Sequence, residues 1–238
     1  MEFNEELFED LKPKVKELLK ESRWSHTLGV VDVAEDLALM NNVDPWKAKI
    51  AALLHDCAKN LSDEVQTKFL EDNNIDISYL DDYQKVVHSH VGAHYIKIVF
   101  GIDDEELINA IKYHTTGRPN MTMLEKIVFL ADFLDPGRDY EHYAKTFFTA
   151  RKYAYRNIDE AMQFVLSKLI VDLNRRGKPI YKDTFDANEY YSKFDFPKES
   201  NKRMIWNIIL LIVSVAIIVA GLIYLKLTFA PDMIIPSN

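Results

Sequence analysis

Apolar residues recur at helical spacing through most of this 238-residue chain, and residues that interrupt helices are scarce. The sequence has 7 glycines and 8 prolines, and no stretch convincingly alternates between apolar and polar residues. A helix buries one face by placing apolar side chains every three or four positions, whereas a half-buried strand places them at every second position. The chain is therefore predicted to be all-α, with a helical bundle as its soluble part.

Capping signals divide this pattern into separate helices. Asp44 followed by Pro45 predicts a helix start, because proline suits the first helical position and the aspartate can accept hydrogen bonds from exposed backbone N–H groups. Thr122 and Glu125 form a capping box that predicts another start. Further starts are expected at Ser62 and Asp103, and ends at Gly101, Pro136-Gly137 and Gly177.

The segment Met204–Leu225 differs from the rest because it contains no charged residue. Its length matches the roughly 20 apolar residues that a helix needs to cross a bilayer. A buried core helix is the alternative, but such a helix normally carries a polar stripe, and this segment offers only Asn207 and Ser214. A single transmembrane helix over residues 204–226 is the favoured interpretation.

Charges on either side of this segment predict its orientation. Lys198, Lys202 and Arg203 precede it, whereas only Lys226 and Asp232 follow it, and cationic residues favour the cytoplasmic side. No secretory signal is expected, because the first residues are strongly charged. The predicted organisation is a cytoplasmic domain over 1–189, a linker over 190–203, the membrane helix over 204–226 and a short extracytoplasmic tail over 227–238.

Composition restricts the partners and the kind of metal site. Acidic side chains outnumber basic ones by 37 to 29, so no general positive field favours nucleic acid, which is not expected as a partner. The only cysteine, Cys57, excludes an intrachain disulfide and a cysteine-based zinc site. Histidine must therefore supply any soft metal ligand. The sequence leaves a homodimer open.

Histidines are concentrated in one part of the chain, since six of the seven lie between positions 26 and 114. His26, His55 and His114 lie beside or within segments that otherwise present apolar faces. Burying an imidazole without a partner is costly, and imidazole nitrogens with carboxylates bind iron, manganese or zinc. In the pair His55-Asp56, adjacent helical side chains diverge by about 100° and can border one cleft. An isolated pair is more commonly a core histidine beside an exposed aspartate.

The wider pattern favours a metal site over that alternative. His88 and His114 follow the pair, and Asp132 is a carboxylate in an apolar helical segment. Four cations suited to phosphate lie near these residues or in glycine-containing turns: Arg23, Lys59, Arg118 and Arg138. Each could also be a solvated surface charge, and the case for substrate contact is strongest for Lys59 and Arg118. Metal ligands together with such cations predict phosphoryl chemistry.

The series His26, His55-Asp56 and Asp132 resembles the H…HD…D signature of HD-domain phosphohydrolases. Four longer stretches closely resemble the YqeK-type symmetrical bis(5'-nucleosyl)-tetraphosphatases. They are residues 23–30 (RWSHTLGV), 51–59 (AALLHDCAK), 113–119 (YHTTGRP) and 135–139 (DPGRD). The resemblance covers roughly residues 11–191 and implies an HD-domain helical bundle.

The resemblance also implies a ligand set for two divalent metal ions, with iron the expected occupant and manganese an alternative. One ion would be held by His26, His55, Asp56 and Asp132, and a second site would be completed by His88 and His114. Asp56 would then bridge the two ions. The family more often has proline at His90, so His88 and His90 both remain candidates, although the spacing to the following Val-Gly-Ala favours His88.

The implied activity is metal-dependent hydrolysis of dinucleoside polyphosphates, with symmetrical cleavage of diadenosine tetraphosphate into two molecules of ADP. Asp56, Lys59 and Arg23 would be catalytic. The substrate phosphates would contact Arg23, Lys59, Thr116, Gly117, Arg118 and Arg138. Two alternatives are an HD phosphatase or phosphodiesterase acting on another nucleotide, and a membrane-tethered module that senses a nucleotide without turnover.

Overall fold

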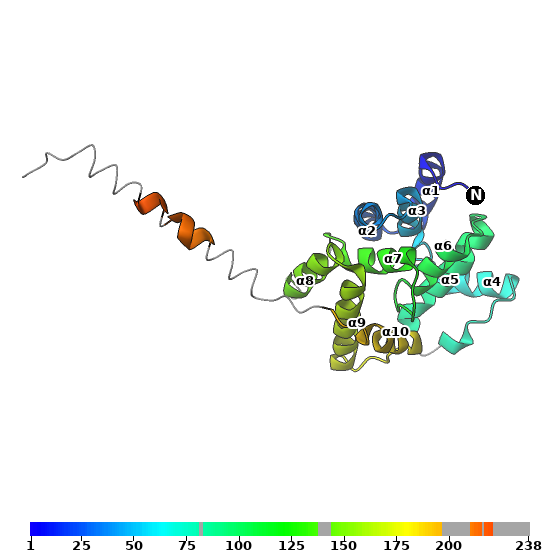
Figure 1. Cartoon of the computed structure of the whole chain (residues 1–238). Coiled ribbons are helices and arrows are strands. Elements are labelled where there is room, and N and C mark those ends of the chain that lie inside the picture. Colours follow the sequence, from blue (N-terminus) through cyan, green and yellow to red (C-terminus); the bar gives the residue numbers. More distant parts are fainter. Residues whose placement is uncertain (81–82, 138–143, 197–209, 216, 221–238) are drawn as a thin grey trace, which may run out of the picture. The chain divides into compact units, whose positions relative to one another are not determined.

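The computed structural model describes residues 1–80, 83–137, 144–196, 210–215 and 217–220 (Figure 1). The chain divides into two compact units, Met1–Phe194 and Asp195–Asn238. Every regular element in the described part of the first unit is helical, which confirms the all-α prediction. These elements are α1 (Glu5–Leu18), α2 (Glu21–Met40), α3 (Pro45–Leu54), α4 (Asp63–Asp72), η1 (Ser78–Leu80), α5 (Gln84–Val99), α6 (Glu105–Tyr113), α7 (Met123–Leu134), α8 (Ala144–Ala154), α9 (Ile158–Arg175) and α10 (Lys182–Ser192).

Three helix starts follow the capping signals of the sequence, at Asp44, Ser62 and Thr122. The Asp44 carboxylate accepts hydrogen bonds from the backbone N–H groups of Trp46 and Lys47, at 2.9 and 3.3 Å. At the start of α7, the Thr122 hydroxyl and the Glu125 carboxylate form the reciprocal bonds of a capping box. These caps satisfy N–H groups that have no partner within their own helix, and they fix where α3 and α7 begin.

The start of α6 lies one residue later than predicted. Asp104, and not Asp103, caps this helix by accepting a hydrogen bond from the Leu107 N–H at 2.9 Å. Asp103 instead forms an ion pair with Lys97 of α5 at 2.7 Å. The local sequence allows either aspartate to cap the helix. The ion pair with α5 engages Asp103 and leaves Asp104 as the cap.

Helix α7 is the centre of the first unit, since it packs against α2, α3, α6, α8 and α9 (Figure 1). Most of its side chains are buried, including the run Ile127–Ala131. Helix α3 also lies in the core, and its residues Ile50–Leu54 are fully buried. The ends of these two helices are therefore held by packing, which positions the residues that follow them.

The first unit extends beyond the domain end predicted at residue 189. Helix α10 continues to Ser192, and the Tyr191 side chain is only 1% exposed. The Tyr191 hydroxyl also accepts a hydrogen bond from the Met121 N–H at 3.2 Å. The charged and aromatic composition predicted a linker here, but Tyr191 packs into the core.

The predicted transmembrane helix is not confirmed. Within the described residues, no helix has both the length and the apolar character needed to cross a bilayer. Residues 210–215 and 217–220 are helical. The remaining parts of the predicted span, 204–209, 216 and 221–226, lie outside the described residues, as does the predicted tail over 227–238.

Candidate metal centre

All six predicted metal ligands come together where five helices meet. His26 is on α2, His88 on α5 and Asp132 on α7, His55 and Asp56 follow α3, and His114 follows α6. The buried end of α3 explains why His55 is fully enclosed and Asp56 is 2% exposed. His88 and His114 are also buried. Residues up to 106 positions apart in the sequence thus lie around one buried centre.

Asp56 lies between two groups of histidines. His26, His55 and Asp56 form one group, and Asp56, His88 and His114 form the other, with the ligand atoms of each group within 4.8 Å of one another. Asp56 Oδ2 is 3.5 Å from His55 Nε2, whereas Asp56 Oδ1 is 3.1 Å from His88 Nε2. The two carboxylate oxygens therefore face different groups, which is the arrangement that a bridging ligand requires.

Asp132 lies next to the first group. Its Oδ1 atom is 3.0 Å from His26 Nε2 and 3.9 Å from His55 Nε2. Of the six residues it is the most exposed, with 22% of its side chain accessible. One carboxylate and two imidazoles thus converge on a point from α2, α3 and α7.

Each of three histidines is oriented by a contact at its Nδ1 atom. His55 Nδ1 donates to the Ala52 carbonyl at 2.6 Å, and His114 Nδ1 donates to the Ile111 carbonyl at 2.7 Å. His26 Nδ1 is 2.6 Å from the carboxylate of Asp135. A proton on Nδ1 leaves the Nε2 lone pair available to a metal ion. In all three residues Nε2 is the atom that faces the cluster.

The cluster favours a bound cation. His88 Nε2 and His114 Nε2 are 3.2 Å apart, and within the described residues the buried His55 Nε2 has no hydrogen-bond partner. His55 and His114 each carry their proton on Nδ1, so the buried lone pairs on their Nε2 atoms need a proton donor or a cation as partner. The donor set of imidazole nitrogens and carboxylate oxygens suits a divalent transition-metal ion. The residues present therefore fit divalent metal binding.

Protonation states are consistent with this chemistry. Burial alone would raise the pKa of Asp56, but the surrounding imidazoles of His55, His114 and His88 hold it well below its usual range. Burial lowers the pKa of His88 to about 4, although Asp56 acts in the opposite direction. At neutral pH, Asp56 is thus a carboxylate and His88 is neutral, which are the forms that bind metal ions.

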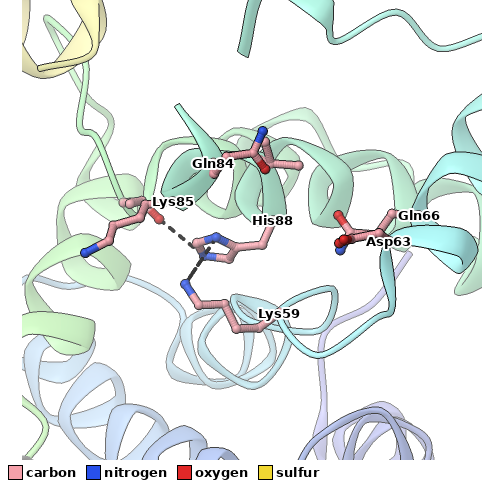
Figure 2. Close-up of a pocket in the computed structure, with 8 residues that line it drawn as sticks. Lys59, Asp63, Gln66, Gln84, Lys85 and His88 are labelled. Carbon is pink, nitrogen blue, oxygen red and sulfur yellow. Dashed lines mark hydrogen bonds between the residues drawn. The ribbon is translucent and has the colours of Figure 1, made fainter. Parts of the chain in front are cut away.

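Two predicted catalytic cations border the centre. The Arg23 guanidinium pairs with Asp56 Oδ2 at 3.0 Å. Lys59 Nζ lies 3.0 Å from His88 Nε2 and 3.2 Å from His88 Nδ1. Figure 2 shows the Lys59 side chain reaching toward the His88 ring, with Asp63 and Gln66 on the opposite side of the cavity from Lys85. Both positive charges are therefore close to the predicted ligands.

Arg118 is placed differently from these two cations. Its guanidinium pairs at 2.7 Å with the carboxylate of Glu125, which is fully buried, and it also lies over the Tyr113 ring. These contacts give Arg118 a role in holding the turn before α7, and its predicted contact with substrate stays a prediction. Arg138 lies outside the described residues.

The turn after α6 presents a different threonine from the one predicted. The Thr116 hydroxyl is buried and donates to the Gly117 carbonyl at 2.9 Å. The Thr115 hydroxyl instead lies 3.1 Å from His114 Nε2. Gly117 has a φ of 66°, so glycine suits the left-handed conformation of this turn. Adjacent threonines look equivalent in sequence, and only the path of the turn distinguishes them.

His88, and not His90, joins the cluster. His90 is 2% exposed, but its Nδ1 atom lies 3.1 Å from the Tyr79 hydroxyl and its ring contacts Tyr181. Two positions along a helix correspond to a turn of about 200°, so residues 88 and 90 face nearly opposite directions. Helix geometry therefore resolves the ambiguity that the sequence left between them.

Two cavities adjoin the centre and meet at its edge. The Lys59 cavity, of about 510 Å³, is lined by residues that include Lys59, Gln66 and His88. The Tyr181 cavity, of about 430 Å³, is lined by residues that include Tyr181 and Leu173. Gln84, Lys85 and Thr115 line both cavities. The shared wall thus includes the threonine whose hydroxyl faces the metal ligands.

Fold and site together define an HD-domain protein, and the family model described as HD domain matches residues 23–137. The symmetrical bis(5'-nucleosyl)-tetraphosphatase of Halalkalibacterium halodurans is 40% identical over 172 residues, which cover 71% of this chain and 89% of the relative. The enzyme of the same name from Bacillus subtilis is 34% identical, with 72% and 90% covered. The chain belongs to the family of symmetrical bis(5'-nucleosyl)-tetraphosphatases.

A solved structure supports the assignment to the HD superfamily. The crystal structure of a Clostridium acetobutylicum protein, described as a predicted HD superfamily hydrolase involved in NAD metabolism, matches with a TM-score of 0.71 and 34% identity. The match covers 78% of this chain and 96% of the other. The similarity therefore extends over nearly the whole of that protein and most of the first unit.

Proposed function

We propose that this protein hydrolyses dinucleoside polyphosphates and cleaves diadenosine tetraphosphate symmetrically into two molecules of ADP. The observation that carries the proposal is the buried cluster in which Asp56 lies between two groups of histidines. Relatives at 34–40% identity bear the name of this activity. A hydrolase of this class needs ligands for divalent metal ions beside a space for phosphate, and the cluster adjoins such a space.

The proposed cofactor is a pair of divalent metal ions, with iron as the expected occupant and manganese as an alternative. His26, His55 and Asp132 would hold one ion, His88 and His114 the other, and Asp56 both. When bound, the ions would supply a water of lowered pKa and polarise the phosphoryl oxygens. Imidazole and carboxylate ligands suit iron and manganese, and the absence of cysteine ligands fits that choice.

The proposed catalytic cations are Lys59 and Arg23. Lys59 Nζ is 3.0 Å from His88 Nε2 and lines the Lys59 cavity, so its ammonium can contact a phosphate bound there. Arg23 holds Asp56 Oδ2 at 3.0 Å and keeps that carboxylate oriented between the histidine groups. Fixed positive charges in a partly enclosed site stabilise the negative charge that develops on the phosphate chain.

The two cavities offer a place for each half of a symmetrical substrate. Symmetrical cleavage breaks the central phosphoanhydride bond, which lies midway between two identical nucleosides. The Lys59 and Tyr181 cavities meet at Thr115, whose hydroxyl is 3.1 Å from His114 Nε2. We assign one nucleotide arm to each cavity, with the centre of the phosphate chain at their junction.

Product analysis tests this function. The full-length protein, purified without oxygen in detergent, is analysed for metal, incubated with diadenosine tetraphosphate, and its products are separated by chromatography. About two metal ions per chain and ADP as the sole product are expected. AMP with ATP would overturn symmetrical cleavage, whereas metal-loaded protein that releases no product would overturn the hydrolase assignment.

We also propose that residues 204–226 anchor the protein in the cytoplasmic membrane, with the HD domain in the cytoplasm. The support is the apolar stretch Met204–Leu225, which carries no charge and is preceded by Lys198, Lys202 and Arg203. After carbonate extraction of membranes, the full chain is expected in the pellet, and a chain that ends at Phe194 in the soluble fraction. Release of the full chain by carbonate would overturn the anchor.

A further inference from the structure

His26 is held differently from the other histidines whose Nδ1 atoms have an acceptor. His55 and His114 each donate to a carbonyl of their own helical turn, three residues earlier. His26 Nδ1 instead lies 2.6 Å from Oδ2 of Asp135, a residue 109 positions away at the end of α7. The orientation of His26 therefore depends on the side chain of another element.

Asp135 is itself fixed in place. It is only 1% exposed, and its Oδ1 atom accepts a hydrogen bond from the Gly137 N–H at 2.9 Å. One carboxylate oxygen is thus directed to the turn after α7 and the other to His26. A buried carboxylate with both oxygens engaged has little freedom to rotate, so it can define the plane of the imidazole that it contacts.

Gly29 provides the space that this carboxylate occupies. It lies on α2, nearly one turn after His26, and a Cβ atom added there would be 2.1 Å from Asp135 Oδ1 and 3.0 Å from Asp135 Cγ. Real Cβ contacts are essentially never shorter than 3.0 Å. Glycine within a 20-residue helix is otherwise unfavourable, so the close approach of Asp135 supplies a reason for it.

We infer that Gly29 and Asp135 form a socket that positions His26 for metal binding. The Asp135 carboxylate accepts a hydrogen bond from His26 Nδ1–H. This leaves the Nε2 lone pair for the metal ion, on the side of the ring where Asp132 Oδ1 lies 3.0 Å from Nε2. Asp135 is a positioning residue and does not contact the metal. This inference rests on the metal centre of the proposed function.

A double-mutant cycle on the full-length protein in detergent tests the socket, with Co²⁺ affinity and the visible spectrum of the Co²⁺-loaded protein as readouts. Asp135→Ala and Gly29→Ala are each expected to weaken binding of one Co²⁺ roughly 10- to 100-fold, because loss of a residue that orients a ligand has effects of this size. The double variant is expected to bind no more weakly than Asp135→Ala alone.

The melting temperature of the metal-free protein gives an independent readout. Gly29→Ala should change it in opposite directions in the natural sequence and in the Asp135→Ala background. In the natural sequence Gly29→Ala forces Asp135 away and should lower the melting temperature. In the Asp135→Ala background the clashing carboxylate is gone and Pro136 Cδ, at 3.7 Å, is an ordinary van der Waals contact. The same change should then raise the melting temperature, because alanine favours a helix. Gly92→Ala on α5 is the matched control, since its nearest non-local neighbour would be at 3.4 Å and Co²⁺ binding should be retained.

The outcomes separate this inference from the proposed function. Additive losses of Co²⁺ affinity, or a Gly29→Ala variant that binds Co²⁺ normally, would overturn the socket while the metal centre stands. Natural protein that binds no Co²⁺ would instead overturn the centre itself, and the melting temperatures would still report on the contact between Gly29 and Asp135.

Discussion

The two halves of the candidate metal centre are built in different ways. The His26 half comprises His26, His55 and Asp132, and the Nδ1 atoms of its histidines are fixed by Asp135 and the Ala52 carbonyl. The His88 half comprises His88 and His114. Of these, His114 is fixed by the Ile111 carbonyl, whereas both ring nitrogens of His88 lie within 3.2 Å of Lys59 Nζ. Only the His26 half has every histidine held by a protein acceptor.

This difference predicts different roles for the two halves in metal binding and in the response to substrate. A ligand that is held in place before the metal arrives loses little freedom on binding, so the His26 half should bind its ion more tightly. The His88 half borders the Lys59 cavity, and His88 contacts a cation that can also bind phosphate. We expect the His26 half to act as the fixed part of the centre and the His88 half to respond to substrate.

The largest effect is expected at Asp56, which belongs to both halves. Asp56→Ala should remove both ions and lower kcat/KM for diadenosine tetraphosphate by about a thousandfold or more, since metal catalysis contributes several kcal/mol. Metal analysis and steady-state kinetics measure the two effects. Asp10→Ala, at an exposed carboxylate on α1, is the control and should bind and turn over normally. An Asp56→Ala variant with normal turnover would refute the bridging role.

Variants of single histidines test the inequality of the halves. His88→Ala should leave one tightly bound ion, whereas His26→Ala should leave an ion whose affinity is roughly 10- to 100-fold weaker. Titration with a chelator, followed by metal analysis, measures both. His94→Ala, an exposed histidine on the same helix as His88, is the matched control. Equal affinities of the ions left in the two variants would show that the halves are equivalent.

The cavities beside the His88 half should affect substrate binding more than chemistry. Leu173→Trp narrows the Tyr181 cavity and should raise KM for diadenosine tetraphosphate about tenfold, which corresponds to about 1.4 kcal/mol of lost contact, with little change in kcat. Leu18→Trp is the control, because it makes the same substitution in a groove between α1 and α5, away from the metal centre, and should leave KM unchanged. If KM is the same in both variants, the nucleoside does not occupy the Tyr181 cavity.

The sequence predicted those parts of the molecule that local chemistry decides. Thr122 and Glu125 lie three positions apart, so their capping box could be recognised without tertiary information. The gathering of His55, Asp56 and Asp132 was predictable because burying such groups without partners is costly. The structure brings these residues together as expected, whereas their roles as metal ligands await the measurements proposed above.

Contacts between distant segments were not predictable in the same way. Asp135 meets His26 across 109 residues, and the only local signal was a glycine at position 29 within a helix. Tyr191 resembled part of a linker because its neighbours are charged, but its ring packs against the core. The missed contact and the wrong linker have one cause: a single sequence carries no information on which remote surface a side chain will meet.

Arg118 is the case in which this limit bears directly on function, and its expected effect on catalysis is the smallest. Arg118→Met removes the partner of the buried Glu125 and should destabilise the fold by about 1–3 kcal/mol, while KM changes by less than about twofold. Thermal unfolding and kinetics at the same temperature separate the two effects. Adding Glu125→Gln should recover part of the stability, because no charge then remains buried without a partner. A tenfold rise in KM with unchanged stability would instead show that Arg118 contacts the substrate, as the sequence predicted.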